Sequence, residues 1–158
     1  MMRLPSLGPR GEGWVAIQAL LLAATVAAGM VGPAWADGAR VATTASGSVL
    51  ILGGGVLALL GIRDLRDALT PLPYPLTDAE LVETGVYALV RHPIYGGLVI
   101  ASLGWALLTA SPAAFGAAAV LLGFFELKSR REEAWLEERF PGYAAYRTRT
   151  RRLIPWIG

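Results

Sequence analysis

The sequence predicts an all-α integral membrane protein: a bundle of about four transmembrane helices with a cytosolic C-terminal helix. The chain has 158 residues, 54% of them hydrophobic, and its mean hydropathy of +0.50 is higher than that of typical soluble domains. Apolar runs close to the roughly 20 residues that one bilayer crossing requires follow one another along the chain. Clusters of glycine, proline and charged residues separate these runs. The length predicts a single domain, residues 1–158.

The first crossing is expected at residues 14–35, where Gln18 is the only strongly polar side chain of the apolar run. A secretory signal peptide is the alternative, because a positively charged start precedes the run and Ala34-Trp35-Ala36 resembles a cleavage site. The run is long for a signal peptide, and a second apolar run follows soon afterwards. Both features favour a retained transmembrane helix.

The second crossing is expected at residues 45–62, after a polar link at residues 37–44. Gly53, Gly54 and Gly55 lie at its middle. Within lipid, small residues allow a neighbouring helix to approach closely. The three glycines therefore predict a closely packed helix seam rather than a ligand site.

Two further apolar runs, residues 94–109 and 113–127, are joined by so short a link that they predict an antiparallel helical hairpin. The cytosolic tail, residues 128–158, is expected to begin as a charged helix that Phe140-Pro141-Gly142 ends. Tyr143 and Tyr146 are expected to anchor the following turn at the level of the lipid headgroups.

Between the second crossing and the hairpin lies the longest polar stretch between crossings. Pro71, Pro73 and Pro75 predict that residues 69–76 run extended across the membrane surface. Thr77-Asp78-Ala79-Glu80 has the pattern of a capping box that opens a short turn.

The distribution of positive charge predicts the topology. Of the 14 Lys and Arg residues, four crossings with both termini in the cytosol place 13 on the cytosolic side and leave only Arg40 outside. Basic residues next to apolar helices indicate the lipid bilayer as a partner rather than nucleic acid. With no cysteine and one histidine, neither a disulfide nor a metal site is expected.

The single histidine, His92, lies in residues 87–95, where a polar segment returns to apolar sequence. Proline disfavours helical geometry in the residue before it and is tolerated in the first helical turn, so His92 is expected in an extended corner ahead of a helix. On the charged helix, Phe125, Lys128, Glu132 and Leu136 share one face, and Glu126, Arg130, Glu133 and Glu137 share the next. The predicted topology puts both segments on the cytosolic side, where they can form a polar pocket.

Two plainer interpretations compete with this pocket. The charged helix can be a solvated helix with i,i+4 ion pairs, each contributing a few tenths of a kcal/mol. His92 can simply hydrogen-bond a loop carbonyl.

Taken together, the motifs resemble a known enzyme family. They are Gly85-Val86-Tyr87, Arg91-His92-Pro93-Ile94-Tyr95-Gly96, Glu132-Glu133-Ala134-Trp135-Leu136, Phe140, Tyr143, Tyr146 and Leu153-Ile154-Pro155. This pattern resembles the isoprenylcysteine carboxyl methyltransferase and phospholipid methyltransferase family of integral membrane enzymes, from about residue 81 onward. The resemblance implies transfer of a methyl group from S-adenosylmethionine to a lipophilic or small acceptor, a carboxylate, an amine or a thiol.

The resemblance also implies a set of site residues. The implied cofactor-binding residues are Leu81, Val82, Tyr87, His92, Pro93, Ile94, Tyr95 and Glu132, and the implied catalytic residues are Lys128, Arg91 and Glu133. Lys128 stands where the family has an arginine that orients the acceptor, and a lysine offers a point charge instead of a bidentate fork. Arg91, Arg130 or Arg131 can take over that role. Arg151 stands where the family more often has a proline.

Several functions remain compatible with the sequence. The alternatives to a methyltransferase are an NADPH-dependent membrane reductase, because the C-terminal parts of membrane sterol reductases look similar, and a non-catalytic small membrane protein. The three central glycines lack the strand context of a soluble dinucleotide-binding fingerprint. Prenylcysteine, a phospholipid amine, a small thiol and an isoprenoid acid all fit as the acceptor, and the oligomeric state stays open.

Overall fold

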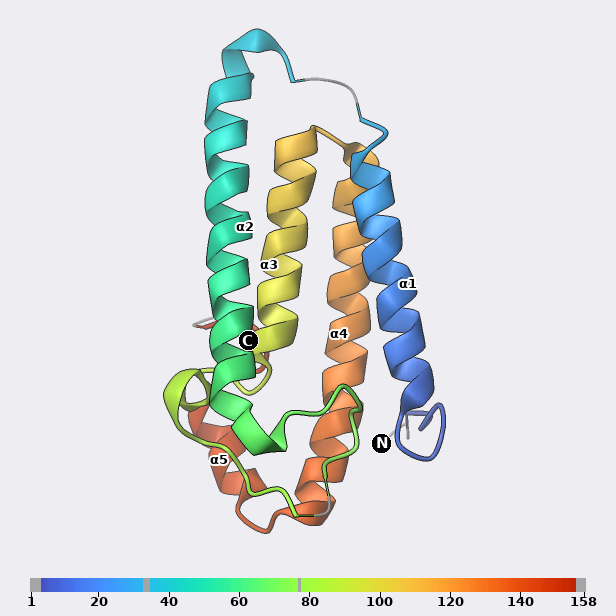
Figure 1. The fold of residues 1–158 in the computed structure, drawn as a ribbon, viewed down its shortest axis with the longest axis vertical. Coiled ribbons are helices and arrows are strands. Elements are labelled where there is room, and N and C mark those ends of the chain that lie inside the picture. Colours follow the sequence, from blue (N-terminus) through green and yellow to red (C-terminus); the bar gives the residue numbers. More distant parts are fainter. Residues whose placement is uncertain (1–3, 33–34, 77, 156–158) are drawn as a thin grey trace.

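The computed structural model describes residues 4–32, 35–76 and 78–155, and these form a bundle of long helices (Figure 1). The long helices are α1 (Glu12–Gly29), α2 (Asp37–Leu65), α3 (Pro93–Thr109) and α4 (Pro112–Arg139), and the short α5 is Tyr143–Arg149. Two 3-10 turns, η1 (Arg66–Ala68) and η2 (Gly85–Ala88), lie in the long connection between α2 and α3. Within the described ranges no strand occurs beyond one isolated bridge, so the all-α prediction is confirmed.

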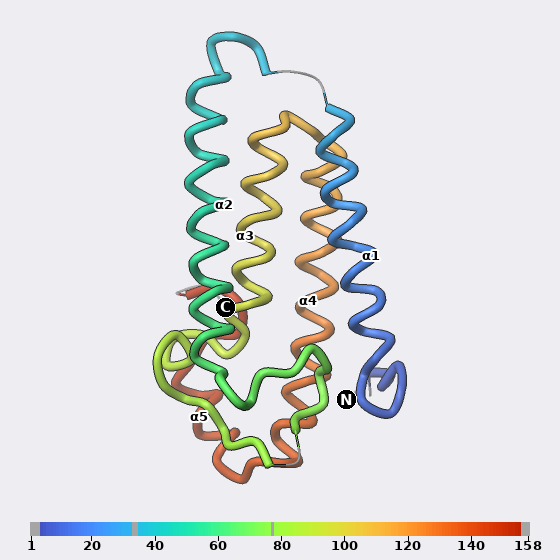
Figure 2. Tube along the Cα trace, in the orientation of Figure 1, coloured from blue at the N-terminus to red at the C-terminus, as the bar shows by residue number. Residues whose placement is uncertain are grey.

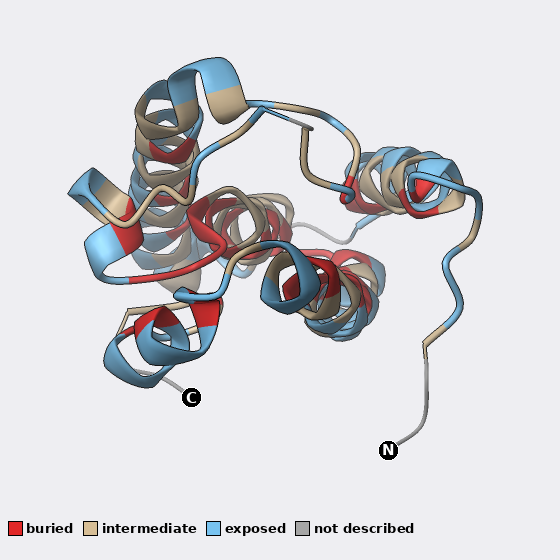
Figure 3. Cartoon of the chain, turned by 90° about the horizontal axis from the view of Figure 1, so that it is seen from below, coloured by how far each residue is buried: buried red, intermediate tan, exposed pale blue. Residues whose placement is uncertain are grey.

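The four long helices are arranged in the order α2, α3, α4, α1, with α1 and α2 at opposite edges (Figure 1). Three of them, α1, α2 and α4, are long and apolar enough to cross a membrane, and α3 is a shorter apolar helix. Seen along the helices, buried residues gather toward the middle and exposed residues face outward (Figure 3). The outward face of α2 carries Val49, Leu52, Val56 and Leu59, which suits contact with lipid tails. The chain is therefore an integral membrane protein.

The ends of the first two helices differ from the expected limits. The expected first crossing reaches residue 35, but α1 ends at Gly29; within that range residues 33 and 34 lie outside the described part of the chain. The expected polar link at residues 37–44 is helical, because α2 already begins at Asp37. Ala-rich sequence after Gly38 favours a helix, and Asp37 lies in the first turn, where a carboxylate is stabilised by the helix dipole.

Helices α3 and α4 form a hairpin at residues 93–139. Ala110 adopts a left-handed conformation, φ 53°, which ends α3. The Ser111 side chain then accepts a hydrogen bond from the Ala114 backbone N–H at 3.2 Å and caps α4. The charged segment expected from residue 128 onward continues α4 without a break to Arg139.

A seam of small residues joins α2 to α3, but it uses one residue of the central glycine triplet. A Cβ built on Gly54 lies 2.4 Å from the carbonyl oxygen of Gly97, whereas Gly53 and Gly55 have nothing within 4 Å. Gly47 and Gly104 make a second close approach along the same seam. The predicted close packing is therefore confirmed at Gly54, whereas Gly53 and Gly55 make no such contact with α3.

Substitution of Gly54 by valine is expected to destabilise the bundle, because the new side chain must push α2 and α3 apart. Overpacking of this kind costs about 1–3 kcal/mol. Gly53→Val is the matched control, since it adds the same β-branched residue to the open face of the same helix turn. The midpoint of thermal unfolding in detergent measures the stability of both variants. Equal midpoints for the two would contradict the close packing of α2 and α3 at Gly54.

Residues 69–76, called the strap below, cross the end of the bundle in a non-helical path (Figure 2). The backbone N–H of Tyr74 donates to the carbonyl of Arg10 at 3.3 Å, and the Tyr74 ring packs edge-on against Trp135 with centroids 5.6 Å apart. The strap is thus anchored on both α4 and the segment that precedes α1. The capping box expected next to it involves Thr77, which lies outside the described residues.

The C-terminal segment folds back onto the residues before α3. The backbone N–H groups of Arg91 and His92 donate to the carbonyls of Arg151 and Arg152 at 2.8 and 2.9 Å. As a result Tyr143 and Tyr146 are 1% and 3% exposed, so the expectation that they anchor at the headgroups is wrong. The turn that carries these tyrosines lies against protein instead of the lipid headgroups.

Candidate functional site

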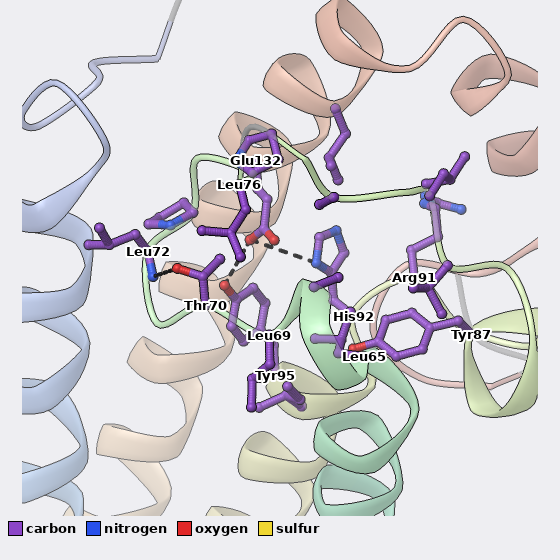
Figure 4. A pocket seen from close by; sticks show the side chains of 18 of the residues that line it. Leu65, Leu69, Thr70, Leu72, Leu76, Tyr87, Arg91, His92, Tyr95 and Glu132 are labelled. Atoms are coloured by element: carbon purple, nitrogen blue, oxygen red, sulfur yellow. Dashed lines mark hydrogen bonds and ion pairs between the residues drawn. The ribbon is translucent and has the colours of Figure 1, made fainter.

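A cavity of about 380 Å³ lies at the strap end of the bundle (Figure 4). Helices α1 to α5, the strap and the segment before η2 all contribute to its lining. The strap residues Leu69, Leu72 and Leu76 give it an apolar side, and His92, Tyr95 and Glu132 give it a polar one. Apolar lining with a few convergent polar groups is typical of small-molecule sites.

Most of the residues expected at the site line this one cavity. Those that do are Leu81, Val82, Tyr87, Arg91, His92, Ile94, Tyr95, Lys128 and Glu132. Pro93 and Glu133 are not among the lining residues. Pro93 opens α3 and sits against Gly61 of α2, and Glu133 lies behind His92.

His92 precedes α3 in a non-helical conformation, φ −128° and ψ 62°, as the following proline predicts. Its buried ring stacks on Tyr95 with centroids 5.4 Å apart and an interplanar angle of 4°. Its Nδ1 is 4.0 Å from Glu132 Oε2, and its Nε2 is 3.3 Å from Glu133 Oε1. The single imidazole is therefore held between the two adjacent glutamates of α4.

Glu132 carries a carboxylate that lines the cavity. The Tyr95 hydroxyl donates to its Oε2 at 2.8 Å (Figure 4), and the Tyr95 ring stacks in turn on Phe125, 4.7 Å away. These contacts restrict the side chain, and 22% of it remains exposed. A fixed, partly open carboxylate can accept hydrogen bonds from the hydroxyl or ammonium groups of a ligand.

Glu133 and Arg91 form a buried pair next to the cavity, which Arg91 lines and Glu133 does not. The Arg91 Nε donates to Glu133 Oε1 at 2.8 Å, and its Nη1 donates to the carbonyl of Thr150 at 2.5 Å. Arg152 Nη2 donates to Glu133 Oε2 at 3.2 Å. The two oxygens of Glu133 thus contact cations of the chain itself, which joins α4 to the segment before α3 and to the C-terminal segment.

Lys128 lies one turn before Glu132 and is 1% exposed. Its Nζ donates to Gln18 Oε1 at 2.5 Å and sits 4.8 Å from the centroid of the Tyr95 ring. The other candidate cations of α4 point elsewhere: Arg130 pairs with Glu126 on the surface, and Arg131 lies over the Trp135 ring, 4.1 Å from its centroid. Of these three cations, only Lys128 lines the cavity.

Several lining residues were not expected from the sequence. They include the strap residues other than Tyr74, together with Gln18, Phe140, Tyr143 and Tyr146. Gln18 did carry a signal, since it is the only strongly polar residue in an apolar run and such residues inside a membrane are expensive. The Tyr146 hydroxyl donates to the carbonyl of Tyr87 at 2.7 Å, and burial raises the pKa of both tyrosines, so both stay neutral.

The fold defines a membrane protein with a cavity at one end of its helical bundle. A model of the phospholipid methyltransferase family matches residues 42–142, well over half of the chain, and the chain belongs to that family. The expected resemblance is thereby confirmed.

The chain is also similar to protein-S-isoprenylcysteine O-methyltransferase B of Arabidopsis thaliana. The two are 34% identical over 80 residues, which are 49% of this chain and 41% of the relative. The matched part thus spans less than half of the relative's length. No solved structure is significantly similar to the chain.

Proposed function

We propose that the protein is an S-adenosylmethionine-dependent methyltransferase that acts on a lipophilic or small acceptor at the membrane. The observation that carries this proposal is one cavity lined by His92, Tyr95, Glu132 and the buried cation Lys128. Family membership supports the methyltransferase class.

The residues present fit this cofactor. The volume of about 380 Å³ lies in the range of about 300–1,000 Å³ that is typical of ligand sites. Glu132 can accept from ribose hydroxyls or from the ammonium, and His92 can bind the adenine or the carboxylate. The face of a tyrosine ring stabilises a nearby cation such as a sulfonium. When bound, the cofactor supplies an electrophilic methyl group, which an acceptor lone pair takes while the C–S bonding electrons remain on sulfur.

The chain's contribution to such a transfer is alignment and exclusion of water. Attack in line with the breaking bond needs the acceptor atom at a fixed position, and a dry cavity keeps water from competing. The strap covers the cavity with leucine and proline side chains and serves the second need. A carboxylate or thiolate acceptor requires no general base, whereas a neutral amine must lose a proton at some stage.

The acceptor is assigned to the Lys128 end of the cavity. Lys128 lies one helical turn further into the apolar part of α4 than Glu132 does, and it contacts Gln18 of α1. An acceptor that arrives sideways from the bilayer meets this pair first. In the proposed topology both termini and the cavity are cytosolic, and Glu133 and Arg91 act by positioning His92.

Lys128→Met is expected to lower methyl transfer about 10-fold or more, the effect of losing a hydrogen bond from a charged group. Its affinity for S-adenosylhomocysteine should stay close to that of the unchanged protein, because methionine keeps the apolar stem against Tyr95. Labelled-methyl transfer and calorimetric titration measure the two quantities. Gln18→Leu should show a smaller loss of methyl transfer, again with little change in affinity for S-adenosylhomocysteine. Unchanged methyl transfer by Lys128→Met would contradict the proposed role of Lys128.

The function itself is tested with detergent-purified protein and with membranes. S-adenosylhomocysteine is expected to raise the thermal unfolding midpoint, and NADPH is not. A labelled-methyl assay on membranes then identifies the lipid-soluble product that gains the label. Stabilisation by NADPH alone would favour the reductase, and a response to neither compound a non-catalytic role.

A further inference from the structure

Tyr143, the first residue of α5, lines the same cavity as His92 and Glu132. Its side chain is 1% exposed, and its hydroxyl has no hydrogen-bond partner among residues 4–32, 35–76 and 78–155. Buried polar side chains nearly always have a partner, because water has been removed from them at a cost. A buried hydroxyl without one at a cavity therefore points to a partner outside the chain.

The position of Tyr143 does not depend on its hydroxyl. One turn further along α5, the Tyr146 hydroxyl is satisfied by the carbonyl of Tyr87. The segment is held by Arg91, whose Nη1 donates to the carbonyl of Thr150, and by the backbone pairing of Arg151 with the residues before His92. Packing of the Tyr143 ring against Tyr146, with centroids 5.7 Å apart, completes the anchoring. These contacts hold the segment in place without the Tyr143 hydroxyl.

The surroundings of the hydroxyl decide what it can bind. Burial, with a smaller contribution from Glu133, raises the pKa of Tyr143 far above neutrality, so the group is a neutral O–H that can donate and accept. Glu133 is already engaged with Arg91 and Arg152. The Glu132 carboxylate and the His92 ring line the same cavity, and among the described residues His92 Nε2 also makes no hydrogen bond, so a ligand there meets a carboxylate, an imidazole and the Tyr143 hydroxyl.

We propose that the Tyr143 hydroxyl hydrogen-bonds to a polar group of the cofactor and holds it together with Glu132. This inference rests on the proposed function and adds a binding residue from α5 to it. If the hydroxyl had a purely structural role, its removal would lower the stability of the protein. If the hydroxyl binds the ligand, its removal lowers only the affinity for the ligand.

The test is Tyr143→Phe, which removes the hydroxyl and keeps the ring. We expect S-adenosylhomocysteine to bind about 3- to 10-fold more weakly, the effect of one neutral hydrogen bond. The unfolding midpoint without ligand should not fall, because the deleted group makes no contact in the described chain. Tyr74→Phe is the matched control, since Tyr74 is 41% exposed and does not line the cavity, and both quantities should stay unchanged in it.

Failure of the inference and failure of the proposed function give different results in these measurements. Unchanged affinity in Tyr143→Phe overturns the inference, whether or not the midpoint falls. Failure of the unchanged protein to bind S-adenosylhomocysteine overturns the proposed function itself, and the inference with it. Titration of 5′-methylthioadenosine, which lacks the amino acid head, refines a positive result. A loss for both ligands assigns the contact to the nucleoside, and a loss for S-adenosylhomocysteine alone assigns it to the amino acid head.

Discussion

Glu132→Gln is expected to weaken the binding of S-adenosylhomocysteine by about 10- to 100-fold, the scale of a hydrogen bond to a charged group. Glutamine keeps the shape of the side chain and still offers an oxygen to the Tyr95 hydroxyl, so the local packing survives. What is lost is the negative charge toward the cavity. Isothermal titration in detergent measures the affinity, and His92→Ala should give a loss of similar size because it removes the ring that stacks on Tyr95.

The control for this prediction lies on the same helix. Glu137 pairs with Arg147 near the surface and does not line the cavity, so Glu137→Gln removes a carboxylate from α4 without changing the site. Its affinity for the ligand should equal that of the unchanged protein. If Glu132→Gln and His92→Ala both bind normally, the cofactor site is elsewhere.

Glu133→Gln should have the largest effect on stability, a loss of about 3–5 kcal/mol. The substitution leaves the buried guanidinium of Arg91 without its anion, and an unpaired buried charge is far more costly than the pair is favourable. It also weakens the connection from α4 to the C-terminal segment through Arg152. Thermal unfolding in detergent, monitored by circular dichroism, measures the loss.

An exposed ion pair provides the comparison for Glu133→Gln. Glu83 pairs with Arg149 at 2.7 Å, and both side chains are substantially exposed, so Glu83→Gln should cost about 0–1 kcal/mol. Similar midpoints for the two variants would show that the buried pair contributes no more than a surface pair. That result would also remove the proposed role of Arg91 and Glu133 in positioning His92.

The sequence predicted the elements well where one local property decides them. Long apolar runs predicted the helices, and the short link at residues 110–112 predicted the hairpin. His92 before Pro93 predicted a non-helical corner, because proline restricts the residue before it. The helical period placed Lys128, Glu132 and Leu136 on one face, and all three line the cavity.

The local sequence pattern gave wrong predictions where the environment of a side chain depends on residues that are distant in the sequence. A tyrosine pair in a basic, amphipathic turn has the same pattern whether it faces lipid headgroups or protein, and Tyr143 and Tyr146 face protein. Three consecutive glycines are equivalent in sequence, but only Gly54 points at α3, since residues one position apart on a helix differ by about 100° in direction. The segment at residues 37–44, expected to be a polar link, is instead the first part of α2.

The sequence by itself determined the class of molecule: an apolar helical chain with its positive charge at one side of the membrane and with a histidine, a pair of glutamates and a lysine at that side. Only the tertiary structure decided which of these groups share a cavity. It directed Glu132 toward the cavity and Glu133 toward Arg91, although the two are adjacent in the chain. It also brought Gln18 of α1 to Lys128 of α4. The physical reason is that hydropathy and helical period act over a few residues, whereas burial and ion pairing depend on segments that meet only after the helices pack.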